Sequence, residues 1–377
     1  MSEPASEYPA PRANDLLIGH QAAERTLFEA ARSGRLAHAW LIAGPRGIGK
    51  ATLAFRFARH LFVHRGAAGP GASAQAPSLF ESEPLVAPKE PAAEGASLAV
   101  GANHPVFKRV AAAGHADLRC VERTLHPKTG KLRGEIVVDD VRALGEFLRL
   151  TPAEGGWRVA IVDCADEMNS HAANAVLKVL EEPPARAILL LVSHSPGRLL
   201  PTIRSRCRKL VLKPLAATEF AQAMVAHFPE MEPAERTTLG ALSEGSLGRA
   251  HRLAELGGVA IYREMMDLFA GLPRLDVAAA HRLAGKLAGE GFEVGIELFG
   301  AWHARLVRAA ATGEGGRELL DGEGAVFRRL ANPHALDRWF ELWDKNRRLF
   351  RQADGLNLDR RQVLLSAFLS LEQAARA

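Results

Sequence analysis

Two short apolar runs with a helical segment between them constrain the fold of this chain more than any other feature. The runs are residues 159–162 and 188–192, and each is too short for a core helix and ends at polar residues. Such runs are typical of buried parallel strands. Residues 174–182 carry apolar side chains at helical spacing and stop at two prolines, which lack the N–H that a helix needs. The order strand, helix, strand predicts a right-handed crossover in a parallel α/β sheet.

A glycine-rich loop earlier in the chain has the context of a phosphate-binding loop. The sequence GPRGIGK at residues 44–50 follows an apolar run and precedes a helical pattern. Strand, glycine loop and helix is the arrangement that such a loop requires. Backbone N–H groups around Gly44, Gly47 and Gly49 would surround phosphate oxygens, and Lys50 would add a positive charge.

The first predicted strand of the crossover ends on Asp163, at the edge where a doubly wound sheet places ligand or metal contacts. Taken alone, this carboxylate fits a binding role and a purely structural role, as a helix cap or a solvated strand end, equally well. The glycine loop favours a binding role for Asp163, because a strand-end aspartate downstream of such a loop belongs to a nucleotide site.

Four segments together resemble the clamp-loader branch of the AAA+ ATPases. They are GPRGIGK at 44–50, DCAD at 163–166, AANAVLKVLEEPP at 172–184 and SRC at 205–207. The resemblance covers roughly residues 15–250 by motif and the rest by arrangement. It implies an α/β P-loop domain with a parallel sheet, followed by a small helical lid and an all-α collar.

The resemblance also implies roles for individual residues. Arg206, in Ser-Arg-Cys, would be an arginine finger for the ATP site of a neighbouring subunit, and Ser193 would be the polar residue that senses the terminal phosphate. The expected nucleotide-binding residues, a degenerate set, are Gly44, Gly47, Gly49, Lys50, Thr52, Asp163 and Ser193.

Three departures from the family pattern predict little or no ATP hydrolysis. The position after the loop lysine normally holds Ser or Thr, whose hydroxyl binds Mg²⁺, but here it is Ala51, with Thr52 one place late. The glutamate that acts on the attacking water is replaced by Cys164, and a thiol does not substitute for a carboxylate base. Gly248 stands where active subunits carry a second phosphate-sensing arginine. ATP binding without turnover remains open, and so does a role for magnesium.

The length predicts two or three domains, and the resemblance implies three. We expect a P-loop domain at 1–213, a helical lid at 214–258 and a helical collar or oligomerisation domain at 259–377. Within the first, residues 63–104 are rich in Ala, Gly, Pro, Ser and Glu, and we expect them to form a long mobile insertion. Many clamp-loader subunits carry a four-cysteine zinc module there, but no cysteine precedes Cys120, so no zinc is expected.

Other local patterns predict further elements. Residues 117–121 look like a strand, and a helix after residue 136 would be capped by Asp139 or Asp140. In the C-terminal part, apolar residues at helical spacing predict two helices, each with one apolar face. One consists of Leu336, Trp339, Phe340, Trp343 and Phe350, and the other of Val363, Leu364, Ala367, Phe368 and Leu371.

Hydropathy argues against a membrane-spanning or secreted protein, whereas the net charge excludes no class. The net charge of +5 permits contact with nucleic acid without requiring it. No apolar run approaches the length of a membrane span, and the first residues lack the pattern of a secretory signal, so a cytoplasmic location is expected. Three cysteines imply no disulfide framework.

The resemblance implies a regulatory and structural subunit of a polymerase assembly. Its partners would be the gamma or tau and delta subunits in a hetero-pentamer, and through them the sliding clamp and primed DNA. An ATP-hydrolysing motor subunit of the gamma/tau type is the alternative, against which Ala51, Cys164 and Gly248 all count. A nucleotide-dependent scaffold outside replication is a third hypothesis.

Overall fold

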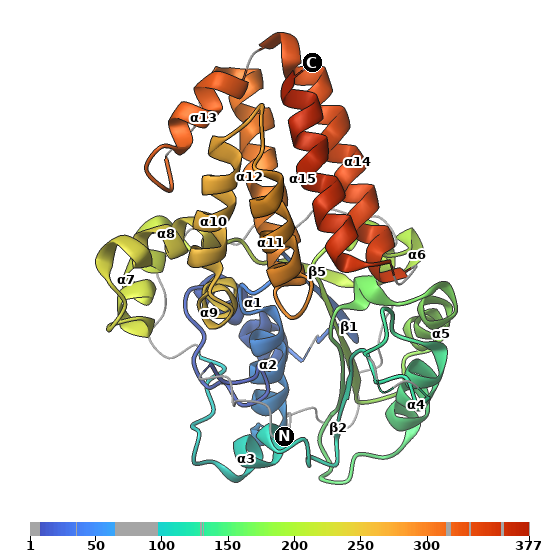
Figure 1. Ribbon diagram of the computed structural model, residues 1–377. Helices are drawn as coiled ribbons and strands as arrows, with labels where there is room; N and C mark the ends of the chain where they lie inside the picture. The colour runs from blue at the N-terminus through green and yellow to red at the C-terminus, as the bar shows by residue number, and fades with distance from the viewer. Residues whose placement is uncertain are drawn as a thin grey trace. The chain divides into compact units, whose positions relative to one another are not determined.

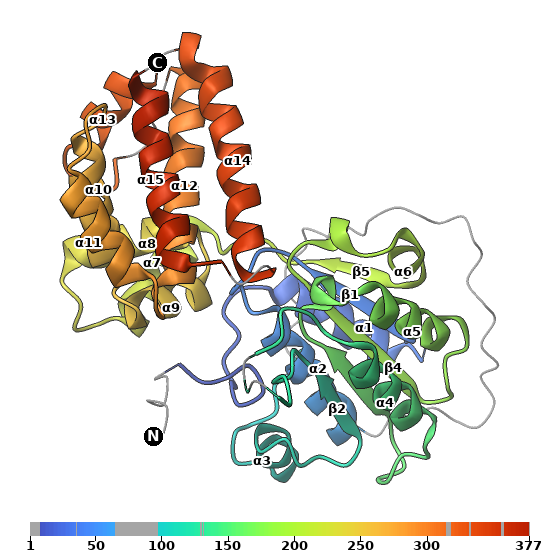
Figure 2. The ribbon, with the colours of Figure 1, turned by 45° about the vertical axis from the view of Figure 1, so that its right-hand side comes forward.

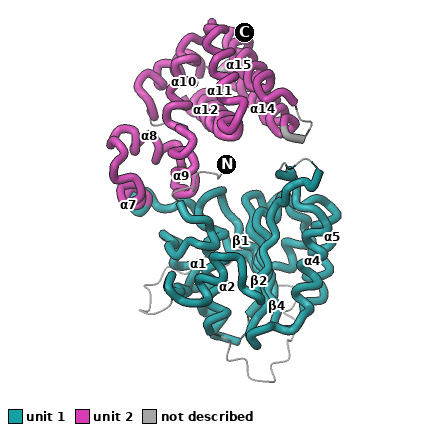
Figure 3. Tube along the Cα trace, turned by 60° about the horizontal axis from the view of Figure 1, so that its bottom comes forward, with its two compact units in different colours: residues 1–219 teal, residues 220–377 magenta. Residues whose placement is uncertain are grey.

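The chain folds into two compact units, an α/β unit at residues 1–219 and a helical unit at 220–377 (Figure 3). The structure is a computed structural model, and it describes residues 8–34, 36–64, 97–128, 130, 132–313, 318–331, 333–355 and 358–376. The division between units lies close to the predicted end of the P-loop domain. The further boundary at residue 258 stays a prediction.

A parallel five-stranded sheet forms the centre of the first unit (Figure 1). Its strands are β1 Ala39–Ala43, β2 Leu118–Val121, β3 Arg158–Val162, β4 Ala187–Ser193 and β5 Arg208–Val211, in the spatial order β2-β3-β4-β1-β5. Every pairing in the sheet is parallel, and β1, β3 and β4 are buried along their whole length. The prediction of buried parallel strands is confirmed.

Helices cover both faces of this sheet (Figure 2). On one face α1 Gln21–Arg32, α2 Lys50–Val63 and α3 Pro105–Ala111 pack against alternate strand residues such as Trp40 and Ile42. On the other face α4 Val138–Arg149, α5 Ser170–Glu181 and α6 Pro201–Arg206 pack against Leu41 and its neighbours. This three-layer arrangement follows from the period of two along each buried strand.

Two helix starts differ from their predictions. The side chains of Asp139 and Asp140 do not cap α4, which begins at Val138 after an extended Val137 with no side-chain cap. Both aspartates lie in the first turn instead, where the exposed N–H groups of the helix favour negative charge. The helix α5 begins four residues earlier than predicted, because the Asn169 side chain caps it by accepting the N–H of Ala172 at 2.9 Å.

Most of the predicted insertion at 63–104 lies outside the described residues. Its described end is packed rather than loose, since Leu98 is fully buried in the core beside α2. The N–H of Leu98 also donates to the Glu24 carboxylate at 2.8 Å. The end of the insertion was therefore predicted too late, because one leucine in an alanine-rich run carries little periodic signal.

The second unit consists of helices and short turns. Its helices are α7 Ala217–His227, which spans the division, α8 Pro233–Ser243, α9 Leu247–Glu255, α10 Gly258–Ala270, α11 Val277–Leu287, α12 Phe292–Thr312, α13 Glu323–Leu330, α14 Leu336–Gly355 and α15 Arg360–Arg376. Aromatic side chains on α10, α12 and α15 form its core, with Phe269 packed against Trp302 and Phe368. Among the described helices none is long and apolar enough to cross a membrane.

One of the two predicted apolar faces is confirmed and the other is partly wrong. Every member of the set on α15 is buried. On α14 Trp339 is buried, but Phe340 is 55% exposed. Adjacent residues lie about 100° apart around a helix, and on α14 the packing covers the side of Trp339 but not that of Phe340.

Candidate functional site

The loop between β1 and α2 has the backbone geometry that close approach to an anion requires. Gly44, Gly47 and Gly49 have φ angles of 148°, 77° and 98°, values that disfavour residues with a side chain. At Gly44 there is also no room for one, because a Cβ atom would lie 2.4 Å from the carbonyl oxygen of Leu212. The glycines predicted from sequence therefore shape this loop.

Lys50 begins α2 and is only 3% exposed. Its Nζ donates to the carbonyl oxygen of Pro45, within the loop, at 2.5 Å. Burial lowers the pKa of Lys50 to about 8, although the nearby Asp163, Cys164 and Asp166 act in the opposite direction. The site therefore holds a buried cation that an incoming anion would stabilise.

A thiol and an imidazole meet at the ends of β3 and β4. Cys164 adopts a left-handed backbone with φ 61°, and its Sγ lies 3.2 Å from Nε2 of His194. Burial, together with Asp163 and Glu167, raises the pKa of Cys164 to about 12. Burial, together with Lys50 and Arg46, lowers the pKa of His194 to about 4. At neutral pH this pair is an uncharged thiol beside an uncharged imidazole.

The pKa values of the two aspartates at the site, Asp163 and Asp166, are shifted in opposite directions. Burial raises the pKa of Asp163 above its usual value. Burial is the largest single influence on Asp166 and opposes its ionisation, but the N–H that His194 donates at 2.9 Å and the other hydrogen bonds to this carboxylate together outweigh it, so the pKa of Asp166 falls below its usual value. Asp163 is thus the less acidic of the two, at the strand end that the sequence predicted.

Two other predicted binding residues are buried. Ser193 is fully buried at the end of β4, and its carbonyl oxygen accepts the N–H of Gly44 at 3.3 Å. Thr52 lies in the first turn of α2 and is 6% exposed, while Ala51 beside it carries no hydroxyl. Ser193 thus joins the end of its strand to the glycine loop through the backbone.

Two contacts to the loop were not predicted from sequence. Nε2 of His20 lies 2.7 Å from the carbonyl oxygen of Ile48, and His20 has a left-handed backbone where α1 begins. Arg46 pairs with Glu167 at 2.9 Å, and Arg123 pairs with the other oxygen of Glu167 at 3.0 Å. Each contact joins residues far apart in sequence, and no local pattern signals it.

Arg206 is the last residue of α6 and projects partly into solvent. Its Nη2 lies 3.1 Å from Oε1 of Glu181, and its Nη1 donates to the carbonyl oxygen of Thr202 at 3.2 Å. The exposed fractions of the two charged side chains are 39% and 52%. The residue predicted as a trans arginine finger is therefore accessible, and it has a carboxylate neighbour.

The predicted second sensor region lies in the helical unit. Gly248 falls in α9, and Arg249 beside it pairs with Glu297 at 2.7 Å and with Glu244 at 3.1 Å. Arg249 is thus held by carboxylates of its own unit.

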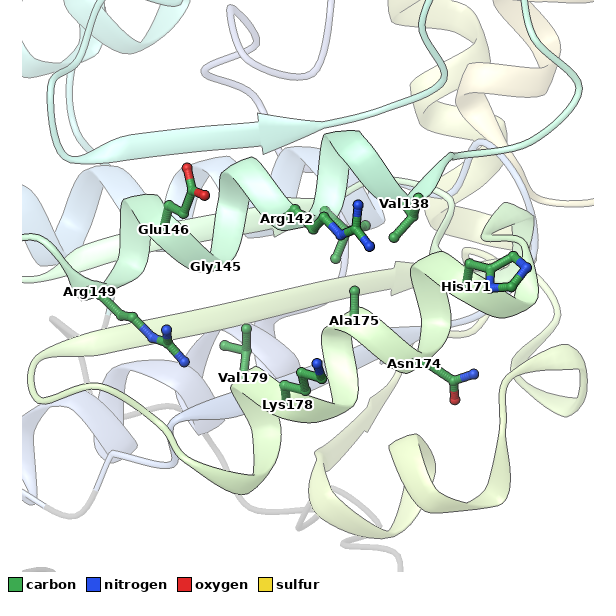
Figure 4. A pocket seen from close by; sticks show the side chains of 11 residues that line it. Val138, Arg142, Gly145, Glu146, Arg149, His171, Asn174, Ala175, Lys178 and Val179 are labelled. Atoms are coloured by element: carbon green, nitrogen blue, oxygen red, sulfur yellow. The ribbon is translucent and has the colours of Figure 1, made fainter.

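A groove of about 380 Å³ runs between α4 and α5 (Figure 4). Apolar residues such as Val141 and Val179 line it together with Arg142, Arg149 and Lys178. None of these residues was predicted to have a role, since helix surfaces with scattered charges are common. Among the described residues, no three His, Cys, Asp or Glu side chains are placed so that they could hold a metal ion.

Comparison with known proteins finds sequence similarity to DNA polymerase III subunits. The sequence model described as DNA polymerase III, delta subunit, matches residues 94–216. A DNA polymerase III subunit delta′ of Pseudomonas aeruginosa is 37% identical over 218 residues, which cover 58% of this chain and 56% of that protein. A subunit gamma/tau of Mycobacterium bovis is 30% identical over 216 residues, covering 57% of this chain and 31% of that protein.

One solved structure, a DNA polymerase III gamma subunit-related protein of Thermotoga maritima, aligns with 93% of this chain and 99% of its own, with a TM-score of 0.39 and 17% identity. This chain spans about half the length of the delta′ relatives that it matches. By its motifs, its parallel sheet with the glycine loop and these sequence matches, the chain is similar to clamp-loader subunits of DNA polymerase III, and delta prime is the member it resembles.

Proposed function

We propose that this chain is a delta prime-type subunit that lends Arg206 to the ATP site of a neighbouring subunit and does not itself hydrolyse ATP. In this role it is a rigid wall of a hetero-pentamer with gamma or tau and delta subunits, which places a sliding clamp on primed DNA. The observation that carries the proposal is the contact between Cys164 and His194 where hydrolysing subunits have a carboxylate base.

The chemistry of this pair favours an inert site. A general base must accept a proton from water at neutral pH. Cys164, with a pKa of about 12, holds its proton, and His194, with a pKa of about 4, is a weak base. Neither replaces a carboxylate that is ionised at pH 7.

The residues at the loop nevertheless suit a phosphate chain. Because Gly44 has no side chain, the loop backbone packs against the Leu212 carbonyl without a clash, and Lys50 provides a buried cation that donates a hydrogen bond to a neutral carbonyl. The magnesium position fits less well, because Ala51 has no hydroxyl. We propose that ATP binds here and orients the subunit, with Lys50 balancing phosphate charge.

The alternative is a hydrolysing motor subunit of the gamma/tau type, which the 30% identity to a gamma/tau relative favours. A motor would need a base at residue 164 and a metal ligand at residue 51. Cys164 and Ala51 provide neither, so the match to gamma/tau is better explained by a shared fold.

ATP turnover by the reconstituted loader on clamp and primed DNA tests the proposal. We expect the isolated chain to be inactive and Arg206→Ala to lower kcat of the assembly by about tenfold or more, because arginine fingers contribute about 10³–10⁵ in other systems. Arg198→Ala, which removes another exposed arginine, is the control. Brisk hydrolysis by the isolated chain would establish the motor function instead.

A further inference from the structure

The ion pair between Glu181 and Arg206 joins the ends of two helices. Glu181 is the last residue of α5 and Arg206 the last residue of α6, and their charged atoms lie 3.1 Å apart. We propose that Glu181 is a positioning residue, which orients the Arg206 guanidinium toward the terminal phosphate of the ATP bound by a neighbouring subunit. This inference rests on the trans role proposed above for Arg206.

The backbone beneath Arg206 is fixed by the core. Ile203 is fully buried on the inner side of α6, and Cys207, which follows Arg206, is 7% exposed. The short helix therefore cannot turn without moving buried side chains. What remains free is the long arginine side chain, whose rotamers must be restricted before it can meet a phosphate in one geometry.

Two contacts restrict that side chain while leaving donors for a ligand. Nη1 donates to Thr202, four residues earlier in the same helix, and Nη2 faces Glu181. A guanidinium has five N–H donors in a planar fork, so these two contacts leave three for phosphate oxygens. Thr202 and Glu181 can stay in place while the finger is engaged.

Because both side chains are exposed, the ion pair can orient Arg206 but is too weak to keep it away from the ATP of a neighbouring subunit. Both side chains are at least a third exposed, and ion pairs of this kind are weak because water screens them. Such a contact cannot withhold Arg206 from a multiply charged phosphate. It can bias the side chain toward one rotamer, which raises the fraction of assemblies ready for the transition state.

The test measures ATP turnover by the reconstituted loader carrying Glu181→Ala, Glu181→Gln or Glu182→Ala. Glu182 is the next residue along the chain and is also exposed, so it controls for loss of surface charge. We expect Glu181→Ala to lower kcat about two- to fivefold with the KM for ATP unchanged, since the finger acts in the transition state. Glu181→Gln should recover most of kcat because its amide oxygen can take the place of Oε1 beside Nη2 of Arg206. Glu182→Ala should match the wild type.

The same substitutions in an Arg206→Ala background separate the two proposals. There, Glu181→Ala should cause no further loss, because its effect passes through Arg206. If Arg206→Ala slows turnover but Glu181→Ala leaves kcat unchanged, raises it, or still lowers it in the Arg206→Ala background, the positioning role is wrong and the trans role survives. If Arg206→Ala itself has no effect, both are wrong. Gel filtration of each assembly confirms that the variants still assemble.

Discussion

At the scale of single residues, the site depends on how burial changes ordinary side chains. Lys50, Cys164 and His194 all lie where burial penalises the charged form, so the amine and the imidazole are less basic and the thiol is less acidic. The consequence differs with the chemistry of each group. The thiol and the imidazole become inert at neutral pH, while Lys50 stays mostly protonated and able to bind an anion.

Lys50 gives a prediction about pH. Its pKa in the free protein is about 8, so it is charged below that pH and neutral above it. Because phosphate prefers the charged form, binding above pH 8 requires proton uptake, and affinity for a fluorescent ATP analogue should fall as pH rises from 8 to 9.5, by at most about tenfold per pH unit. Titrations at several pH values would show this bend.

Lys50→Met provides the control for that experiment. It removes the titrating group, so binding should be weaker at every pH and the bend near pH 8 should vanish. If the affinity of the wild type for the ATP analogue stays constant up to pH 9.5, either Lys50 does not contact the phosphates or its pKa lies above this range.

At the scale of helices, a buried polar cluster holds the C-terminal unit together. Glu323 on α13 has a side chain that is 0% exposed, and it accepts hydrogen bonds from Tyr262 on α10 and Arg305 on α12. The N–H of Leu319 donates to its other oxygen at 2.8 Å. Three helices thus meet at one carboxylate, and burial beside it raises the pKa of Tyr262.

Removal of that carboxylate should be costly. Glu323→Ala leaves the Arg305 charge largely buried without its partner, which typically costs about 3–5 kcal/mol of unfolding free energy. Glu264→Ala breaks an ion pair whose side chains, Glu264 and Lys286, are 44% and 54% exposed, and should cost less than about 1 kcal/mol. Urea unfolding measures both. Similar losses in the two variants would contradict a structural role for the cluster.

At the scale of the whole chain, the two units have separate cores. The first is organised by the parallel sheet, and the second by aromatic residues such as Phe269 and Trp302. Each unit has the size of an ordinary domain, which suggests that each can fold alone.

We therefore expect a fragment of residues 214–377, which keeps α7 whole, to be helical by circular dichroism and to unfold cooperatively in urea. A fragment of residues 259–377 tests the predicted lid boundary, because it lacks α8 and α9, both of which contact α10. If the longer fragment has no cooperative transition, its core depends on the first unit. If the shorter one folds equally well, the collar is a domain of its own.

The helices, the strands and the glycine loop could be predicted from local sequence patterns. Buried strands, helix periodicity and the glycines at 44, 47 and 49 are signals carried by neighbouring residues, so the parallel sheet and the glycine loop between β1 and α2 could be predicted. The roles taken from the family resemblance depend on the motif residues, and those of Arg206 and Ser193 stay predictions.

Which distant side chains meet depends on the packing of the folded chain and could not be predicted. The contact of Cys164 with His194, the pairing of Glu181 with Arg206 and the burial of Lys50 each depend on how strands and helices pack. The exposure of Phe340 and the buried Leu98 likewise depend on which neighbours surround them. The physical reason is that periodicity records which way a side chain points, whereas electrostatics and packing depend on what it points at.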